Sequence, residues 1–318
     1  MKIITFEDIQ NNDITDPVSF YRWTKELLKL QYESLVPCKI SIPYYNGDGF
    51  FNVMPGVFPS IETAGVKMII RNPNHIPALS GDLMLYDSEN DELLALMDST
   101  YITAWRTGAM GAVATTTLAK SHFQSIGLVG MGNVGRAYLI VLLANVNRKL
   151  KINLLRHKGQ EKELEQILIG RGFDVEFNEF DDFESLAKES DVIASAVTVT
   201  HEQFARPEIY KPGTLIVPMH TRGFQDCDPV FDRVIVDDKE GHVKSFGHFN
   251  EFKNCCNLCD VLINPKLGRQ NDDERILAYN IGIALQDFYF ARKIYDKLEK
   301  RIPDISLNKE NIDKYWVK

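Results

Sequence analysis

The sequence has little that points to a membrane, a secretion signal or a nucleic acid. None of its uncharged apolar runs approaches the roughly 20 residues needed to cross a bilayer. The N-terminal stretch MKIITFEDIQ has no apolar core behind its lysine, so we expect a cytoplasmic protein. Lys and Arg number 36 against 44 Asp and Glu, a net charge of -8 with no basic stripe, which argues against a nucleic-acid partner. An anionic ligand would need a local positive pocket.

Cysteine is scarce as well, with five residues in a chain of 318. The number is odd, and Cys255, Cys256 and Cys259 stand close together, which does not resemble a disulfide framework. Cys256 and Cys259 have the spacing of half a zinc site, but no second Cys or His pair lies at a suitable distance. We expect reduced thiols packed near a surface and no bound metal.

The first hundred residues combine one helix with short strands. Asp16-Pro17 is a typical helix start, an N-cap followed by proline. Apolar side chains then recur at helical spacing, at Phe20, Trp23, Leu27 and Leu30. Short apolar segments bounded by Gly, Pro or Asn follow at 50–54, 65–70 and 82–86. They predict the strands of a small sheet.

From about residue 125 to 238 strands alternate with helices. The predicted strands are 125–129, 151–155, 191–196, 214–218 and 233–236, and helices are predicted at 134–145, 161–168 and 183–189. This alternation predicts an α/β fold, a doubly wound parallel sheet with helices on both faces. After Asp272 we expect one long helix, with Ile276, Tyr279, Ile283, Phe290 and Ile294 on one face. The length of the chain suggests about two domains.

A glycine turn carries the strongest chemical signal. It reads Gly130-Met131-Gly132-Asn133-Val134-Gly135, directly after the strand 125–129 and at the start of the helix 134–145. In that context Gly130 permits a tight turn, Gly132 lets the backbone approach a pyrophosphate, and Gly135 lets helix and strand pack closely. Free N–H groups at the helix start would bind the anion. We therefore expect a nicotinamide dinucleotide at these six residues.

The choice between NAD and NADP is made about twenty residues beyond the turn, where an acidic residue would bind the ribose 2′-OH. Here the chain reads Arg156-His157-Lys158 instead. Basic side chains suit a 2′-phosphate, so NADP(H) is favoured, with NAD(H) as the alternative. An ordinary solvated basic turn would give the same pattern.

Two cations stand out in the first hundred residues. Lys67 lies within an apolar strand, where lysine packs poorly unless it points into a polar cleft. Arg106 falls in the first turn of a helix that we expect Thr103 to cap, and the costly Gly108 and Gly111 of that helix indicate close approach of a backbone or a cofactor. Together the two cations would clamp a carboxylate. Separately, each would be a surface side chain or half of a salt bridge.

These residues carry a family resemblance. The segment 102–109, Ile-Thr-Ala-Trp-Arg-Thr-Gly-Ala, is followed after about twenty residues by the glycine turn. Further matches are Met54-Pro55, Asn72-Pro73 after the Lys67 strand, the segment 211–214, and the segment 268–273, Gly-Arg-Gln-Asn-Asp-Asp. The chain resembles the ornithine cyclodeaminase and mu-crystallin family from about Phe50 to Lys297.

The resemblance implies a homodimeric enzyme of amino acid metabolism with two domains. Residues 1–118 and 284–318 would form an α+β domain for substrate binding and dimerisation, and 119–283 a Rossmann domain. Family members bind α-amino or α-imino acids, with residues matching Lys67 and Arg106 on the carboxylate, and pass hydride between the α-carbon and the nicotinamide. We include Thr107 and Ala196 among the cofactor-binding residues. The family includes cyclodeaminases, ketimine reductases, alanine dehydrogenases and a siderophore enzyme that releases 2,3-diaminopropionate oxidatively.

Two departures from the family pattern bear on the reaction. Arg222 stands where cyclodeaminases have a catalytic Asp, and Asn52 where they have a carboxylate facing the side-chain amine. Charge complementarity then favours a ketimine reductase or amino-acid dehydrogenase, with His220 as the remaining acid or base. A cyclodeaminase or 2,3-diaminopropionate-forming enzyme stays an alternative. A non-catalytic NADPH- and ligand-binding protein like mu-crystallin is the alternative of another class.

Overall fold

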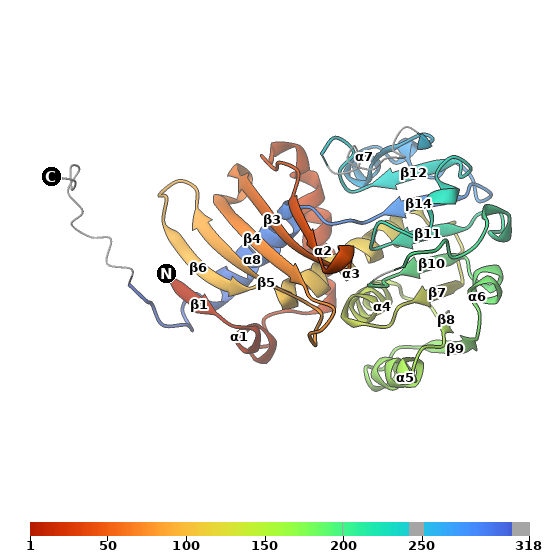
Figure 1. Ribbon diagram of the computed structural model, residues 1–318, viewed down its shortest axis with the longest axis horizontal. Coiled ribbons are helices and arrows are strands. Elements are labelled where there is room, and N and C mark those ends of the chain that lie inside the picture. Colours follow the sequence, from red (N-terminus) through yellow and green to blue (C-terminus); the bar gives the residue numbers. More distant parts are fainter. Residues whose placement is uncertain (199, 242–250, 307–318) are drawn as a thin grey trace.

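The computed structural model describes residues 1–198, 200–241 and 251–306. Two sheets lie side by side in this part of the chain, one built before residue 100 and one after residue 120 (Figure 1). The expected α/β fold is confirmed. We propose that the two sheets form the cores of the two domains expected from the sequence.

The first sheet has six strands in the order β1-β6-β5-β4-β3-β2, antiparallel except for the pair β1 and β6. The strands are β1 (Lys2–Ile4), β2 (Ile40–Tyr44), β3 (Gly49–Phe58), β4 (Thr63–Arg71), β5 (Leu79–Asp87) and β6 (Leu93–Asp98). They include the three predicted segments. Because side chains alternate across a strand, Lys67, Ile69 and Arg71 of β4 all point to one face, and all three are buried.

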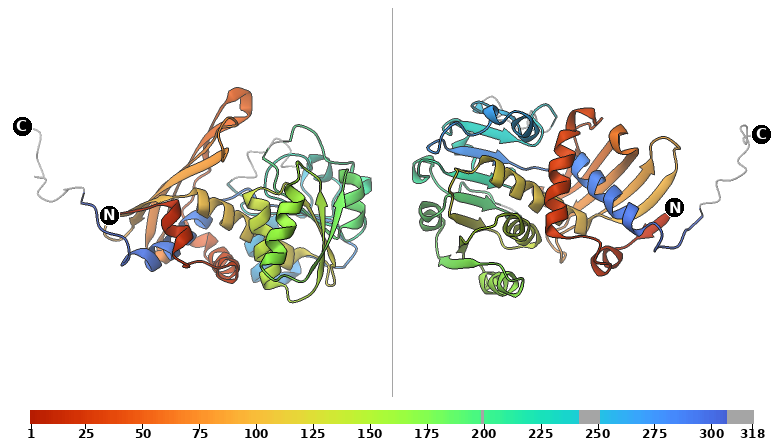
Figure 2. Two further views of the ribbon diagram at one scale, coloured as in Figure 1. Left: turned by 90° about the horizontal axis from the view of Figure 1, so that it is seen from below. Right: turned by 180° about the vertical axis from the view of Figure 1, so that it is seen from behind.

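Helix α3 (Thr100–Leu118) and, from the far end of the chain, α8 (Ala284–Leu298) pack against that inner face. Helix α2 (Pro17–Lys29) packs on α3, α4 (Asn133–Asn145) and α8, and α1 (Phe6–Asn11) packs on α3. Helix α2 begins as predicted, with the Asp16 carboxylate accepting the N–H of Ser19 at 2.9 Å. Helix α8 crosses the sheet in the view from behind (Figure 2), and Phe288 stacks on Phe58 with ring centroids 5.0 Å apart.

The second sheet has eight parallel strands in the order β13-β12-β14-β11-β10-β7-β8-β9. The strands are β7 (Ser125–Val129), β8 (Leu150–Leu155), β9 (Val175–Phe180), β10 (Val192–Ser195), β11 (Leu215–Pro218), β12 (Arg233–Val236), β13 (Cys256–Asn257) and β14 (Ile276–Tyr279). The helices are α4 (Asn133–Asn145), α5 (Gln160–Gly170), α6 (Phe183–Glu189) and α7 (Leu258–Ile263). Counted from β7, the run β9-β8-β7-β10-β11 has the 3-2-1-4-5 order of dinucleotide-binding sheets.

Two local predictions are wrong. Ile276 and Tyr279 belong to strand β14, between β11 and β12, and not to the last helix, which starts at Ala284. Four buried residues form this strand, and so short an apolar run fits helical and extended spacing equally well. Thr103 is not a helix cap either, since α3 begins at Thr100 and is preceded by Ser99. The Thr103 hydroxyl instead donates to the Ser99 carbonyl within the helix at 2.6 Å.

No helix in the described residues is long and apolar enough to cross a membrane. The five cysteines all lie within the described residues as free thiols; Cys227 and Cys259 are buried, Cys255 and Cys256 half-buried and Cys38 exposed. Burial raises the pKa of the Cys255 thiol to about 12 and that of Cys259 to about 11. These thiols are therefore protonated near neutral pH and are poor nucleophiles and metal ligands.

Candidate functional site

The glycine turn lies at the carboxyl end of β7, and its geometry fits a dinucleotide. Gly130 has a φ of +88°, and a Cβ there would lie 2.7 Å from the carbonyl carbon of Ala196. A Cβ on Gly135 would clash with the Gly130 carbonyl oxygen, whereas one on Gly132 would meet nothing within 4 Å. The turn is thus tightly packed on its inner side and open above Gly132, where a pyrophosphate would lie.

Helix α4 starts at this turn with Gly132 as its N-cap, a residue that has no side chain to cap the helix. Asn133 is exposed and Val134 half-buried, while Met131 is buried beneath them. The first N–H groups of α4 are therefore available to an anion. Of the predicted cofactor residues, Ala196 contacts Gly130 directly across the gap between β7 and β10.

Helix α3 packs closely against α4 and so links the Arg106 segment to the glycine turn. A Cβ on Gly108 would lie 2.5 Å from the backbone nitrogen of Tyr138 in α4. The expectation of a close backbone approach is therefore confirmed at Gly108, whereas Gly111 lies against the side chains of Met219 and Tyr138. Thr107 is buried, and its hydroxyl donates to the Thr103 carbonyl at 2.7 Å.

The basic residues after β8, Arg156 and His157, have carboxylate partners within the protein. Arg156 donates from Nε to Glu179 at 2.7 Å and from Nη1 to Asp181 at 2.6 Å. Both acids come from the end of β9, a strand that the sequence did not predict. The backbone N–H of His157 donates to the Glu161 carboxylate at 3.1 Å. Two carboxylates therefore already compensate the charge of Arg156 at the ribose position.

Lys67 and Arg106 lie together in the structure and share one protein carboxylate, so each forms half of a salt bridge, which was the alternative expectation. Lys67 Nζ lies 2.6 Å and Arg106 Nε 2.9 Å from the same oxygen, Oδ1 of Asp287 in α8. Lys67 also donates to the Thr103 hydroxyl at 2.7 Å, and Arg106 Nη1 to Gln286 at 2.9 Å. The side chains of Lys67 and Asp287 are 0% exposed. Asp287 was not among the predicted site residues, although an acid on the apolar face of the last helix is a detectable signal.

Burial dominates the electrostatics of this cluster. Removal from water lowers the pKa of Lys67 to about 8, and the charge of Asp287 opposes that shift. Three enclosed polar atoms nearby, Oδ2 of Asp287, Nε2 of Gln286 and Oδ1 of Asn52, have no hydrogen-bond partner among the described residues. Buried polar groups are normally paired, so atoms of this kind mark a place for a polar ligand.

Lys39 is a third cation that the sequence analysis missed. Burial lowers its pKa, and the charges that act on it come from Asp237, Arg106 and Asp287, which puts it in the same cluster. Asp237 accepts the backbone N–H of Gly282 at 2.5 Å. A Cβ on Gly282 would clash with the Arg106 guanidinium, and the φ of this glycine is +93°. Gly282, two residues before α8, must therefore stay a glycine for Arg106 to keep its position.

His220 follows β11 at the same carboxyl edge of the sheet as the glycine turn. Its Nε2 lies 2.6 Å from Oγ of Ser195, the last residue of β10. Burial lowers the pKa of His220 to about 4, although a hydrogen bond with the Arg222 backbone acts to raise it. The ring is therefore neutral near neutral pH. The strands β10 and β7 adjoin where the strand order reverses, which is where ligands bind in open α/β sheets.

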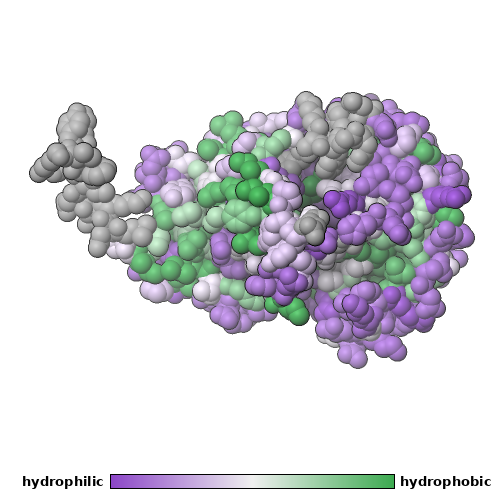
Figure 3. Space-filling view, in the orientation of Figure 1, coloured by the Kyte–Doolittle hydropathy of each residue, from purple (hydrophilic) through white to green (hydrophobic). Residues whose placement is uncertain are grey.

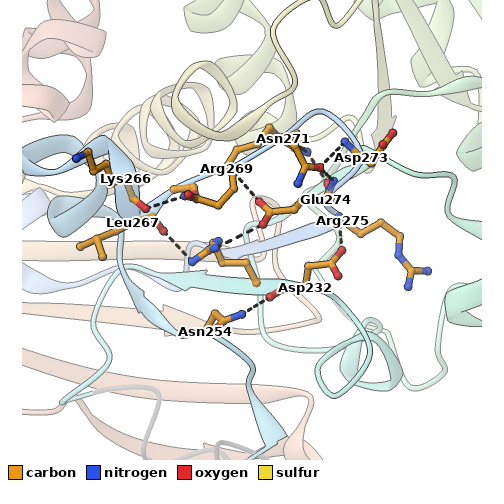
Figure 4. A network of polar contacts seen from close by, with 12 residues as sticks. Asp232, Asn254, Lys266, Leu267, Arg269, Asn271, Asp273, Glu274 and Arg275 are labelled. Atoms are coloured by element: carbon orange, nitrogen blue, oxygen red, sulfur yellow. Dashed lines mark hydrogen bonds and ion pairs between the residues drawn. The ribbon is translucent and has the colours of Figure 1, made fainter.

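The segment 268–273, which supported the resemblance, lies at the opposite edge of the sheet (Figure 4). Arg269 donates to the carbonyl of Leu118 at 2.7 Å and to that of Gly213 at 3.2 Å. It also bonds the carbonyls of Asn271 and Glu274 within its own loop. This arginine ties the end of α3 to the starts of β11 and β14 and is structural. The glycine turn, Ser195 and His220 lie at the other edge, at the carboxyl ends of the strands.

Comparison with known proteins identifies the family and the fold. The model of the ornithine cyclodeaminase/mu-crystallin family matches residues 22–301. The nodulation efficiency protein NfeD of Rhizobium meliloti is 26% identical over 83% of this chain and 84% of its own. A Δ1-pyrroline-2-carboxylate reductase of Bacillus cereus is 24% identical over 83% of this chain and 86% of the reductase. The fold matches that of Thermococcus litoralis Δ1-pyrroline-2-carboxylate reductase, solved with NADH and L-proline, with a TM-score of 0.84 at 21% identity, covering 96% of this chain and 100% of the other.

Proposed function

The chain belongs to the ornithine cyclodeaminase/mu-crystallin family, and on that basis we propose that it is an NAD(P)-dependent oxidoreductase acting on the C–N bond of an α-imino or N-substituted α-amino acid. The observation that carries the proposal is the buried cluster of Lys67, Arg106 and Asp287. Two cations share one carboxylate there, which leaves one positive charge. A single α-carboxylate would balance that charge.

Most of these residues bind the cofactor or the substrate, and His220 transfers a proton. The bound nicotinamide would supply or accept the hydride at the substrate α-carbon. The glycine turn and the start of α4 hold the pyrophosphate, and Thr107 and Ala196 flank the cofactor. Lys67 and Arg106 hold the carboxylate and so fix the α-carbon in position. When the amino acid is oxidised, the neutral His220 would accept the proton from the substrate nitrogen after releasing its contact with Ser195, and in the direction of reduction it would return that proton to the nitrogen.

For the cofactor we propose NADPH over NADH, by about tenfold in affinity, which corresponds to roughly 1.4 kcal/mol. Arg156, His157 and Lys158 supply the positive charge for a 2′-phosphate. The preference is modest because Arg156 must exchange Glu179 and Asp181 for the phosphate.

Ornithine cyclisation is not the proposed reaction. Asn52 is buried and uncharged, and Arg222 stands where a cyclodeaminase has its catalytic Asp. An ornithine side-chain ammonium would find no counter-charge at Asn52 and a like charge at Arg222. Hydride transfer at an imino carbon does not need either carboxylate.

We further propose a homodimer formed through the outer face of the six-stranded sheet. Apolar side chains on and beside this face are exposed: Leu35 (66%), Ile40 (59%), Ile42 (55%), Val57 (38%) and Ile70 (36%). Hydrophobic surface is visible over the sheet in Figure 3. Monomers rarely expose so continuous an apolar surface. A second copy would cover it by an isologous contact.

An activity screen tests the proposed function. Δ1-pyrroline-2-carboxylate and acyclic imino acids, formed from 2-oxo acids with ammonium, are supplied with NADPH or NADH, and ornithine is supplied with NAD+ or NADP+. We expect reduction of at least one imino acid and no proline from ornithine. Tight NADPH binding without turnover of any imino acid would instead support the ligand-binding alternative.

A further inference from the structure

Arg71 is a buried cation outside the Lys67 cluster. It ends β4, on the same face as Lys67 and four residues further along the strand. The residue is 8% exposed, yet its guanidinium has no hydrogen bond, ion pair or ring contact with any described residue. Its Nε is fully enclosed, and the terminal nitrogens are not. A guanidinium is always charged, and leaving it buried without a partner is unfavourable.

The inner face of the sheet connects Arg71 to the Lys67 cluster. At about 3.3 Å per residue, the Cα atoms of Lys67 and Arg71 are roughly 13 Å apart, and both side chains are long enough to shorten the gap between their charges. Asn52 on β3 pairs with Ile69, midway between them, and its buried Oδ1 has no partner among the described residues. A cation, a neutral amide and a second cation thus follow one another along this face.

The charges of these residues do not balance within the described protein. The charges of Asp237 and Asp287 act on Lys39, and that of Asp287 on Lys67 and Arg106, whereas Arg71 has no ion pair with any described residue, in a chain whose net charge is -8. Positive charge concentrated inside an acidic protein attracts and orients an anionic ligand. One α-carboxylate, bound at Lys67 and Arg106, leaves Arg71 still without a counter-charge.

We propose that Arg71 binds a second carboxylate of the substrate. The substrate is then an α-imino or N-substituted α-amino acid that carries a distal carboxylate, with Asn52 beside the chain that joins the two acidic groups. This inference rests on the proposed function and specifies its substrate class. In this inference Arg71 selects substrates by their distal carboxylate, and Lys67 binds the α-carboxylate that all substrates share.

Matched acids test the inference without requiring turnover. Glutarate, adipate and pimelate are compared by calorimetry with pentanoate, hexanoate and heptanoate, using protein saturated with NAD+. We expect at least one diacid to bind tenfold or more tightly than the monoacid of equal length. Arg71→Met should remove this preference and leave the affinities for monoacid and NAD+ unchanged, whereas Lys67→Met should weaken both kinds of acid. Arg148→Met, at an arginine that lies 4.2 Å over the Phe123 ring, is the matched control.

Thermal unfolding separates a binding role from a structural one. Because Arg71 has no partner to lose, Arg71→Met should unfold at the same or a higher temperature than the wild type. A lower unfolding temperature, or a diacid preference that persists in Arg71→Met or is absent from the wild type, overturns the inference. If imino acids are reduced without a diacid preference, the inference fails and the proposed function stands. A diacid preference without any turnover supports the Arg71 subsite and contradicts the proposed function.

Discussion

Lys67 and Arg106 act on one carboxylate, Asp287, and this sharing predicts the effect of replacing either cation. Lys67→Met and Arg106→Met should each lower kcat/KM by a factor corresponding to about 2–4 kcal/mol, because the substrate carboxylate loses a buried charged partner. The remaining cation still compensates Asp287, so the free energy of unfolding should change little. Steady-state kinetics measures the change in kcat/KM, and denaturant unfolding measures the change in the free energy of unfolding. A large loss of stability with unchanged kinetics would assign the cluster to the fold alone.

His220 predicts how stability depends on pH. Its pKa is about 4 in the folded protein, because of burial, and near 6.5 in an unfolded chain. Between these values the unfolded chain holds the proton and the folded chain does not, so this histidine lowers the free energy of unfolding as the pH falls from about 6.5 to 4. His220→Gln should flatten the curve in this window. An unchanged slope in urea unfolding between pH 4 and 6.5 would contradict the assignment.

At the scale of the elements, the ends of β8 and β9 set the cofactor preference. Glu179 comes from β9 and holds Arg156 at 2.7 Å. Glu179→Gln should strengthen NADPH binding relative to NADH, because the guanidinium loses a competing carboxylate. Arg156→Ala should make the two affinities equal. Fluorescence titration of both cofactors measures this, and a Glu179→Gln variant with unchanged relative affinities would show that Arg156 does not contact the ribose.

Most elements were predictable because their patterns are local. The turn from Gly130 to Gly135 has a fixed order of strand, glycines and helix, and Asp16-Pro17 fixes the start of α2. Strand β14 was not predictable, because its four apolar residues continue the spacing of the helix that follows. Strand β9 was missed because half of its six residues, Glu176, Asn178 and Glu179, are polar, so it does not form a continuous apolar run like the strands that were predicted.

The site was only partly predictable, because its members come from distant parts of the chain. Lys67 and Arg106 were conspicuous, as cations in apolar segments. Asp287 lies 220 residues from Lys67, and only the packing of α8 on β4 brings them together. Ser195 has no distinguishing feature in the sequence and gains its position from the register of β10 beside β11. Contacts of this kind follow from tertiary structure and have no local pattern.

At the scale of the whole molecule, the exposed sheet face predicts the state of association. The protein should sediment as a dimer, because an isologous contact would bury the apolar side chains of β2 and β4. Ile40→Glu and Ile42→Glu together should shift it to the monomer, since both side chains are more than half exposed in the single chain. Analytical ultracentrifugation decides this, with Val18→Glu, on the exposed side of α2, as the control. A monomeric wild type would rule out this interface.

The central claim concerns hydride transfer at an imino carbon, and an isotope measurement tests it most directly. The protein is incubated with Δ1-pyrroline-2-carboxylate or an imino dicarboxylate, and with NADPH or NADH carrying deuterium at C4 of the nicotinamide on one face or the other. Mass spectrometry and NMR then locate the label in the amino acid product. We expect one deuterium at the α-carbon, from one face of the cofactor only. In Lys67→Met we expect this deuterated product to be lost. Product without deuterium at the α-carbon from either labelled cofactor, or no product from any imino acid, would contradict the claim.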